Sequence, residues 1–210
     1  MKKIEKLEPS PHVQGRFLIW IEGEQSPVKV TENEVLSFAL YQGKQLEDAE
    51  YSELLHVGQA SMARARGARM LGERPLSRKE LVSRLQSKGF SAQDCADAAD
   101  WLEEIGALNE AAYAASIVRH YSARGYGRRR MEQELRQRGI PYDLWEQALE
   151  EQSAPVDQVV HFLESRFRGK EPDAKDLKRA TDALLRRGFH WEEVKTGLAR
   201  YGTILEEELP

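Results

Sequence analysis

The stretch LVSRLQSKGF, residues 81–90, recurs twice along the chain, as MEQELRQRGI at 131–140 and as ATDALLRRGF at 180–189. Each copy has a Leu four residues before a Gly, a basic residue just before that Gly and a large apolar residue just after it. The three glycines are Gly89, Gly139 and Gly188, which are 50 and 49 residues apart. A constant period of this size is typical of tandem repeats, so the sequence predicts three copies of one structural unit.

Each copy of this segment has the pattern of a helix C-terminus. A Gly can take the left-handed conformation that closes a helix without Cβ strain, and the basic residue before it faces the negative end of the helix dipole. A new helix should follow, started by Ser91 with Asp94 in the first copy and by Pro141 in the second. These next helices carry apolar residues at helical spacing: Cys95, Ala99 and Leu102; Trp145, Ala148 and Leu149; Trp191, Val194 and Leu198. We expect Trp101, Trp145 and Trp191 to be core residues.

One further helix precedes each copy, over residues 59–71, 110–124 and 156–168, and Gly or Pro residues follow each of them. Ser77 with Glu80 forms a capping box, and Asp173 with Asp176 is a weaker start signal. Each repeat therefore has three helices in about 50 residues. A repeat this small buries little apolar surface alone, so neighbouring repeats should stack. The predicted fold is mainly α, with three tandem three-helix units in an elongated, curved array.

The first 55 or so residues have a different pattern, which predicts a small α+β module. The strands RFLIWI at 16–21 and VKV at 28–30 should form a β-hairpin with a turn near Gly23, joined by a strand at 4–7. Thr31 and Glu34 form a capping box for a short helix that should run to Leu40 and close at Gly43. The predicted domains are 1–56 for this module, 57–108 and 109–153 for the first two repeats, and 154–210 for the third repeat with an acidic tail.

Composition and cysteine usage favour a cytoplasmic protein. Hydrophobic residues make up 40% of the chain and charged residues 31%. Cys95 is the single cysteine, which fits a reducing compartment. The basic N-terminus has no apolar run behind it, and no stretch approaches the roughly 18 apolar residues of a membrane span. We therefore expect a cytoplasmic protein without a membrane segment. We also expect a monomer, because no long a/d heptad seam is visible in the sequence.

The sequence shows no convergent set of reactive groups, so we expect no catalytic residue, no metal site and no cofactor. The five histidines are His12, His56, His120, His161 and His190, and no two have the spacing that places metal ligands on one helix face. Cys95 lies on an apolar stripe, where cysteine is usually a small core residue. Gly125-Tyr126-Gly127 lacks the third glycine of a nucleotide-binding fingerprint. These patterns indicate a protein that is not an enzyme.

Positive charge is concentrated in the middle of the chain. Residues 60–140 hold 15 Lys and Arg against 10 Asp and Glu, whereas the segments on either side are acidic. Arg124 and the three arginines at 128–130 form a basic run at a helix start, where the dipole favours acidic residues. Such a conflict with local preference often marks function, and arginine suits forked contacts to phosphate or carboxylate. The alternative is a solvated helix in which Glu132 and Glu134 pair with these arginines.

The candidate partner-binding residues combine this run with basic and aromatic neighbours. They are Arg119, Arg124, Tyr126, Arg128, Arg129, Arg130, Arg136, Arg138, Lys175, Lys178 and Arg179. Arg64, Arg66 and Arg69 form a further basic group. For that group and for the three residues at 175–179, ordinary solvated surface is the favoured interpretation. If the repeats stack, the basic groups would recur along one side as a strip.

The repeated segments resemble those of the RecX family. The residues that carry the resemblance are 81–90, 111–114, 121–127 and 131–140, with a looser match at 184–189. It covers about residues 60–201, and the N-terminal module resembles the extension of longer members. The resemblance implies a regulator without catalytic activity that binds RecA and enters or caps the RecA–single-stranded DNA filament. It also implies depressed strand exchange, ATP turnover and repressor coproteolysis, hence roles in DNA repair and the SOS response.

The resemblance further implies weak binding to single-stranded DNA and possibly to double-stranded DNA. Two other functions are compatible with the residues alone. The first is a general nucleic-acid-binding helical repeat protein, although dedicated binders are usually more basic overall. The second is a scaffold for another protein, with the repeats as its contact surface.

Overall fold

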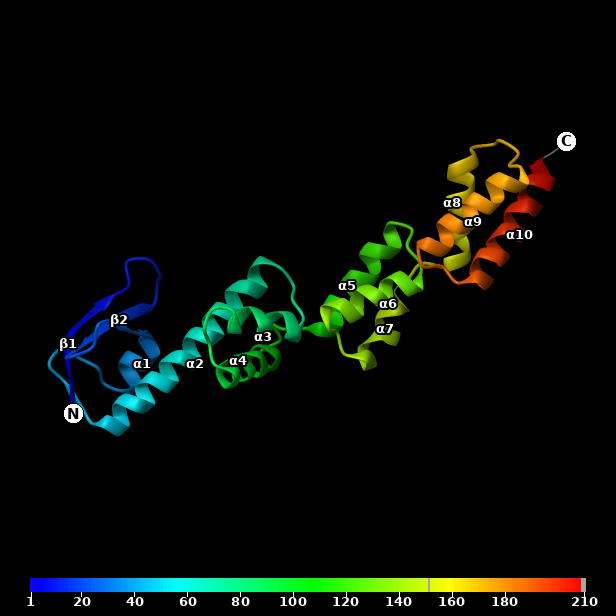
Figure 1. Ribbon diagram of the computed structural model, residues 1–210. Helices are drawn as coiled ribbons and strands as arrows, with labels where there is room; N and C mark the ends of the chain where they lie inside the picture. The colour runs from blue at the N-terminus through cyan, green and yellow to red at the C-terminus, as the bar shows by residue number, and fades with distance from the viewer. Residues whose placement is uncertain (151, 209–210) are drawn as a thin grey trace. The chain divides into compact units, whose positions relative to one another are not determined.

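The computed structural model describes residues 1–150 and 152–208, with side chains as far as Gly202. Helices dominate, and a small antiparallel sheet lies at the N-terminus, so the predicted fold of three-helix repeats behind an α+β module is confirmed (Figure 1). The chain divides into two compact units, an N-terminal unit of residues 1–108 and a C-terminal unit of residues 109–210. The predicted division into four domains is finer than this and stays a prediction.

The sheet has four strands in the order β3-β2-β1-β4. These strands are β1 (Lys2–Pro9), β2 (Arg16–Ile21), β3 (Val28–Thr31) and β4 (Gln45–Leu46). Strands β2 and β3 form the predicted hairpin, and Ile19, Ile21 and Val30 point into the core with Ile4 of β1. Strand β4 was not predicted, because two residues carry no detectable alternation.

Helix α1 (Glu32–Ser37) starts at the predicted capping box, in which Thr31 and Glu34 bond reciprocally. It ends at Ser37, so the prediction that it continues to Leu40 and closes at Gly43 is wrong. The physical reason is Ala39, whose φ of 44° is left-handed and turns the chain back on itself. This turn places Leu40 in the core beneath the sheet.

Helix α2 (Asp48–Glu73) begins well before the predicted start at residue 59 and runs from the sheet into the first repeat (Figure 1). No Gly or Pro interrupts residues 48–57, and two acidic residues lie in the first turn, where the dipole favours them. The predicted boundary between residues 56 and 57 therefore falls inside one continuous helix.

The first repeat is completed by α3 (Arg78–Gln86) and α4 (Ala92–Glu104). Helix α3 starts at the predicted capping box of Ser77 and Glu80, and α4 starts at Ser91, whose side chain accepts from the backbone N–H of Asp94. Cys95, Ala99 and Leu102 are buried, as the apolar stripe predicts. Helices α2, α3 and α4 enclose one apolar core.

The C-terminal unit holds the second and third repeats. Its helices are α5 (Glu110–Ala123), α6 (Arg128–Arg138), a 3-10 turn (Tyr142–Leu144), α7 (Trp145–Leu149), α8 (Pro155–Phe167), α9 (Ala174–Arg186) and α10 (Trp191–Glu208). The predicted glycine positions are confirmed, since Gly89, Gly139 and Gly188 have φ values of 91°, 71° and 91°. The acidic side chains of the predicted tail, Glu206 to Glu208, lie outside the described side chains.

The three tryptophans that we expected in the core differ in burial. Trp145 is buried, and Trp101 is half-buried against the core of the first repeat. Trp191 is 54% exposed, so its prediction as a core residue is wrong. It is the first residue of α10, and Phe189, which is 1% exposed, contributes to the core of the third repeat just before it.

Candidate interaction surface

The second and third repeats meet through their main chains at a contact that we call the glycine junction, formed by Gly127, Arg129, Arg187 and Gly188. The backbone N–H of Gly127 donates to the carbonyl of Arg187 at 2.9 Å, and the N–H of Arg129 donates to the carbonyl of Gly188 at 3.0 Å. A Cβ added at Gly127 would lie 2.3 Å from the backbone nitrogen of Phe189. The two chain segments therefore approach to a distance that a side chain at residue 127 would prevent.

The glycine junction accounts for the unusual start of α6. This helix has Gly127 as its N-cap, no side-chain cap and no acidic residue in its first turn. The carbonyls of Arg187 and Gly188 follow the end of α9, where a helix has its negative pole. They accept hydrogen bonds from the N–H groups at the start of α6. Main-chain carbonyls therefore replace the Asp or Ser side chain that usually accepts from such N–H groups.

Two arginines of the basic run are paired within the C-terminal unit. Arg128 donates from Nη2 to Glu146 at 2.7 Å and from Nε to Glu132 at 2.9 Å. The hydrogen bond to Glu146 is the main reason that the pKa of Arg128 is raised above its usual value. Arg130 donates to Glu134 at 2.7 Å. Glu132 and Glu134 thus pair with these arginines, as the alternative interpretation of the sequence proposed.

Glu134 joins α6 to α5 through a second arginine. Its carboxylate is buried and lies 3.8 Å from Nη2 of Arg138. Arg138 in turn donates from Nη1 to the hydroxyl of Tyr113 at 2.6 Å. Arg130 and Arg138 therefore help to hold α6 against α5 within the second repeat.

Arg124 and Arg129 differ from these paired arginines. Both are exposed, and among the residues that the structure describes no carboxylate lies within ion-pair distance of either guanidinium. Arg129 follows the glycine junction directly, and Arg124 is the C-cap of α5. They are the members of the basic run most available to a partner.

The remaining predicted residues lie in varied surroundings. Arg136 is exposed, with its guanidinium 5.4 Å from the ring centroid of Trp145, and Arg119 is exposed near the end of α5. Tyr126 is half-buried between the ring of Tyr121 at 5.5 Å and the guanidinium of Arg187 at 6.0 Å. The α9 group is exposed, and Arg179 lies 3.8 Å from Asp176; this group consists of Lys175, Lys178 and Arg179.

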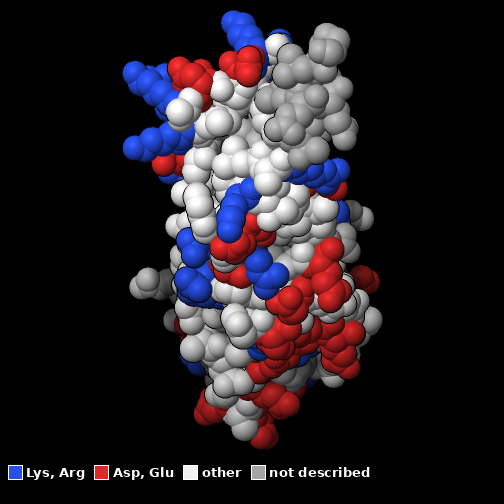
Figure 2. Space-filling view, turned by 90° about the vertical axis from the view of Figure 1, so that its right-hand side faces the viewer, with Lys and Arg blue, Asp and Glu red and all other residues white. Residues whose placement is uncertain are grey.

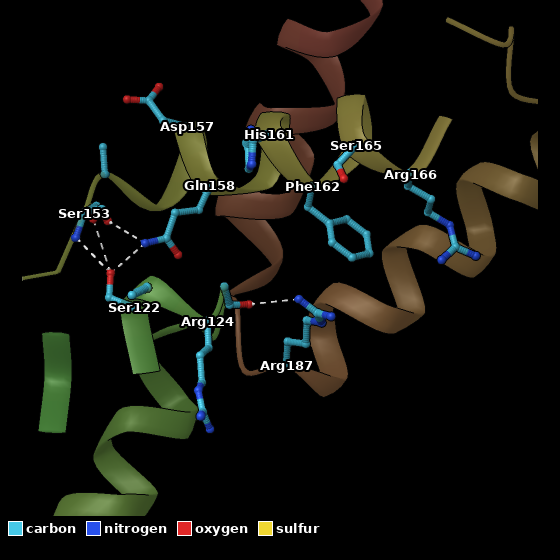
Figure 3. A pocket seen from close by; sticks show the side chains of 13 residues that line it. Ser122, Arg124, Ser153, Asp157, Gln158, His161, Phe162, Ser165, Arg166 and Arg187 are labelled. Atoms are coloured by element: carbon cyan, nitrogen blue, oxygen red, sulfur yellow. Dashed lines mark hydrogen bonds between the residues drawn. The ribbon is translucent and has the colours of Figure 1, made fainter. Parts of the chain in front are cut away.

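A cavity of about 690 Å³, which we call the inter-repeat pocket, lies beside the glycine junction (Figure 3). It is lined by the end of α5, by residues 153 and 154 and by α8. Arg187 enters it from the end of α9, with its guanidinium 5.0 Å from the ring centroid of Phe162 and 3.5 Å from the carbonyl oxygen of Gly125. Arg124 and Arg166 also line the pocket.

A hydrogen-bonded group closes one side of the inter-repeat pocket. The hydroxyl of Ser122 accepts from Nε2 of Gln158 at 2.7 Å and from the backbone N–H of Ser153 at 3.2 Å (Figure 3). The sequence did not point to Phe162, Arg166 or Arg187 as site residues. Arg187 is the basic residue of the third repeated segment. The helix dipole alone accounts for a basic residue at that position, so nothing in the sequence indicated a contact with the second repeat.

Basic side chains elsewhere are mixed with acidic ones. On the face drawn in Figure 2, Lys and Arg lie in several separate groups, with some Asp and Glu among them and a broad acidic patch beside them. Of the group on α2, Arg64 lies over the ring of Trp101 at 5.6 Å and Arg69 lies 3.4 Å from Glu73. Arg66 lines a second cavity, in the N-terminal unit.

Among the described residues, no three His, Cys, Asp or Glu side chains gather in a way that could hold a metal ion. Cys95 is buried, and burial raises the pKa of its thiol, which disfavours the reactive thiolate. Among these residues, no helix is long and apolar enough to cross a bilayer.

Comparison with known proteins identifies the helical repeats. Residues 63–102 match the model "RecX, first three-helix domain", and residues 109–149 match "RecX, second three-helix domain". A regulatory protein RecX from Halorhodospira halophila is 35% identical over 148 residues, which cover 68% of this chain and 91% of that protein. A second, from Trichlorobacter lovleyi, is 34% identical over 137 residues, covering 60% of this chain and 87% of that one.

Solved structures agree with this assignment at the level of the fold. The crystal structure of a regulatory protein RecX superposes with a TM-score of 0.72 at 21% identity, covering 99% of this chain and 100% of that one. RecX from Lactobacillus salivarius superposes with a TM-score of 0.61 at 19% identity, covering 69% and 97%. Together with the sequence matches, the repeat structure shows that the chain belongs to the RecX family of regulatory proteins.

Proposed function

We propose that this protein inhibits the RecA recombinase by binding the RecA–single-stranded DNA filament. The observation that carries the proposal is the position of Arg124 and Arg129. Both are exposed without a carboxylate partner among the described residues, close to the glycine junction. Family membership favours a regulator over an enzyme, and such a regulator acts by binding. A cytoplasmic location goes with this proposal.

The glycine junction makes the surface around Arg124 and Arg129 suitable for docking. Main-chain hydrogen bonds hold the start of α6 against the third repeat, so the arginines project from an ordered base. Their planar guanidinium groups can make forked contacts to DNA phosphates or to acidic side chains of RecA. The inter-repeat pocket beside Arg124 has the size to accept apolar side chains of a partner.

Inhibition would be steric and electrostatic. A protein bound across neighbouring RecA subunits would block the approach of the second DNA and of the repressor, and it would favour disassembly of the filament. ATP turnover, strand exchange and coprotease activity would then fall together. The remaining predicted residues are proposed as peripheral contacts; they are Arg119, Tyr126, Arg128, Arg130, Arg136, Arg138, Lys175, Lys178 and Arg179.

The test is RecA ATP hydrolysis on single-stranded DNA, titrated with this protein below the RecA concentration. We expect wild type to depress hydrolysis, and the double variant Arg124→Glu with Arg129→Glu to need at least tenfold more protein for the same effect, because two favourable contacts become repulsive. The matched control is Arg84→Glu with Lys79→Glu, which changes the charge equally at two exposed residues of α3.

Two results would count against the proposal. If equimolar wild type leaves ATP hydrolysis unchanged, the chain is not an inhibitor of RecA. If both double variants lose inhibition equally, net charge rather than the Arg124 and Arg129 surface is responsible.

A further inference from the structure

Two large apolar side chains of the third repeat lie at the surface. Trp191 is 54% exposed and Leu185 is 38% exposed, whereas Leu184 and Phe189, which are close to them in sequence, are 0% and 1% exposed. An apolar side chain that stays in contact with water contributes only part of the stability that full burial gives. More than half of Trp191 is therefore available for contact with another molecule.

The two exposed residues lie on either side of the glycine junction in sequence. Leu185 is three residues before Gly188, and Trp191 is three residues after it. Since consecutive Cα atoms are about 3.8 Å apart, neither residue has its Cα more than about 11 Å from that of Gly188. The carbonyl of Gly188 accepts from the N–H of Arg129 at 3.0 Å. Leu185 and Trp191 are therefore neighbours of the exposed Arg129 and not isolated apolar residues.

The backbone that carries both side chains is ordered by hydrogen bonds. The carbonyl of Leu185 accepts from the N–H of Gly188 at 3.0 Å, which closes the end of α9. The N–H of His190 donates to the carboxylate of Glu193 at 2.7 Å, which caps the start of α10 just before Trp191. Ordered backbone loses little conformational freedom when a partner binds, so this part of the third repeat is suited to docking.

Charges of both signs surround these two apolar residues. Arg129 and Arg186 are exposed cations. Asp182, three residues before Leu185 on the same side of α9, and Glu192, directly after the tryptophan, are exposed carboxylates. A nucleic-acid backbone carries negative charge alone and would be repelled by the two carboxylates, whereas a protein surface can present charges of both signs. An apolar centre with a charged rim is typical of a protein–protein interface.

We propose that Leu185 and Trp191 form an apolar anchor, which inserts into an apolar depression on a protein partner and does not contact nucleic acid. Tryptophan and arginine are enriched among the few residues that supply most of the energy of a protein interface, so Arg129 would act beside the apolar anchor. This inference rests on the proposed function, because it takes RecA as the partner: within the filament, the apolar anchor contacts RecA and not the DNA. A base can stack on tryptophan, but its phosphates would then lie beside Asp182 and Glu192.

The experiment measures binding of the full-length protein to RecA–single-stranded DNA filaments held by a non-hydrolysable ATP analogue, and to bare oligothymidylate. The double variant Leu185→Ala with Trp191→Ala should bind the filaments at least tenfold more weakly, as expected for loss of the main contact of an interface. Its affinity for bare oligothymidylate should equal that of wild type. The matched control is Leu36→Ala with Tyr41→Ala, which removes an exposed leucine and an exposed aromatic ring from the N-terminal module and should bind filaments as wild type does.

The single variant Trp191→Glu separates loss of binding from loss of folding. Trp191 is the first residue of α10, where the helix dipole favours an acidic side chain, so this variant should unfold at the same or a higher urea concentration than wild type. It should nevertheless bind filaments at least tenfold more weakly, because burial of a carboxylate in an apolar depression is unfavourable.

Three results would overturn the inference alone. If the double variant binds filaments like wild type, the apolar anchor is not a contact, although the proposed function stands. If the control loses as much affinity, any exposed apolar pair has the same effect. If the double variant loses affinity for bare oligothymidylate by the same factor, the apolar anchor stacks on bases. Absence of wild-type binding to filaments would instead refute the proposed function, and the inference with it.

Discussion

The second helix of the first repeat and the second helix of the second repeat begin in opposite ways. Helix α3 starts at Ser77, whose side chain accepts from the N–H of Glu80 while the Glu80 carboxylate accepts from the N–H of Ser77. Helix α6 starts at Gly127 with arginines in its first turn, and its N–H groups donate to carbonyls of the third repeat. The N–H groups at the start of α3 find their acceptors in side chains of the same helix end. Those at the start of α6 find their acceptors in the third repeat.

This difference shows why the first turn of α6 can contain arginines instead of acidic residues. A Ser at residue 127 would cap α6 locally, but its Cβ would collide with Phe189 and Gly188. Without an acidic cap, the first turn of α6 can carry arginines for two reasons. Residues 187 and 188, which follow α9, accept hydrogen bonds from its N–H groups, and Glu132, Glu134 and Glu146 balance the positive charge. The junction of two repeats and the basic surface therefore depend on the same few residues.

The largest effect should come from Gly127→Ala. The φ of Gly127 is −84°, which alanine adopts readily, so any loss reflects the contact with Phe189. We expect the free energy of unfolding in urea to fall by about 3 kcal/mol, the upper range for forcing an extra carbon into packed structure. Gly72→Ala is the control, because a Cβ there meets nothing within 4 Å and should raise stability by about 0.5–1 kcal/mol. Equal stability of the two variants would show that the junction is not tight.

A smaller effect is expected for Glu134→Gln. Glu134 is buried between Arg130 and Arg138, but both arginines are about one-third exposed, so water screens part of the loss. We expect a loss of about 1–2 kcal/mol in the same urea experiment. Glu73→Gln removes a charge from an exposed pair and should change stability by less than about 0.5 kcal/mol. If the two variants lose the same amount, the charges around α6 are not needed to support its arginine start.

Ser77→Ala tests the other side of the comparison. Removing the cap of α3 should cost about 1 kcal/mol, because the N–H of Glu80 loses its acceptor. Ser83→Ala, at an exposed position within α3, should leave stability unchanged or slightly higher. If Ser77→Ala lowers the free energy of unfolding more than Gly127→Ala does, the account is contradicted. The cap of α3 would then contribute more to stability than the glycine junction.

The smallest effect on stability should come from Arg129→Glu. An acidic residue in the first turn of α6 favours the helix dipole, so stability should be unchanged or rise by up to about 0.5 kcal/mol. Inhibition of RecA should nevertheless weaken. A clear loss of stability would instead show that Arg129 is a structural residue, and it would remove the reason for regarding its position as functional.

The repeats were predictable because each depends on local signals. Gly89, Gly139 and Gly188 have the left-handed φ that helix ends require, and the caps at Ser77, Ser91 and Asp173 form within four residues. Trp191 was misassigned because helical spacing alone cannot distinguish the first residue of a helix from an interior one. Phe189, two residues earlier, is the residue that reaches the core.

The two pockets were not predictable, because each depends on contacts between distant segments. Arg187 reaches Gly125 across 62 residues, and Lys29 lines the same pocket as Arg66 and Lys88 only because α2 passes close to β3. The sequence did identify Arg124 and Arg129 as part of a basic run. It could not separate them from Arg128 and Arg130, since pairing with Glu146 and with the buried Glu134 depends on tertiary structure.

The most direct test is binding of this protein to immobilised RecA–single-stranded DNA filaments held by a non-hydrolysable ATP analogue, so that disassembly does not interfere. The account predicts saturable binding by wild type and by the Arg84→Glu, Lys79→Glu control. It predicts at least tenfold weaker binding by the Arg124→Glu, Arg129→Glu variant. Wild-type binding that the latter variant retains in full would contradict the assignment of this surface, and absence of wild-type binding would contradict the proposed function itself.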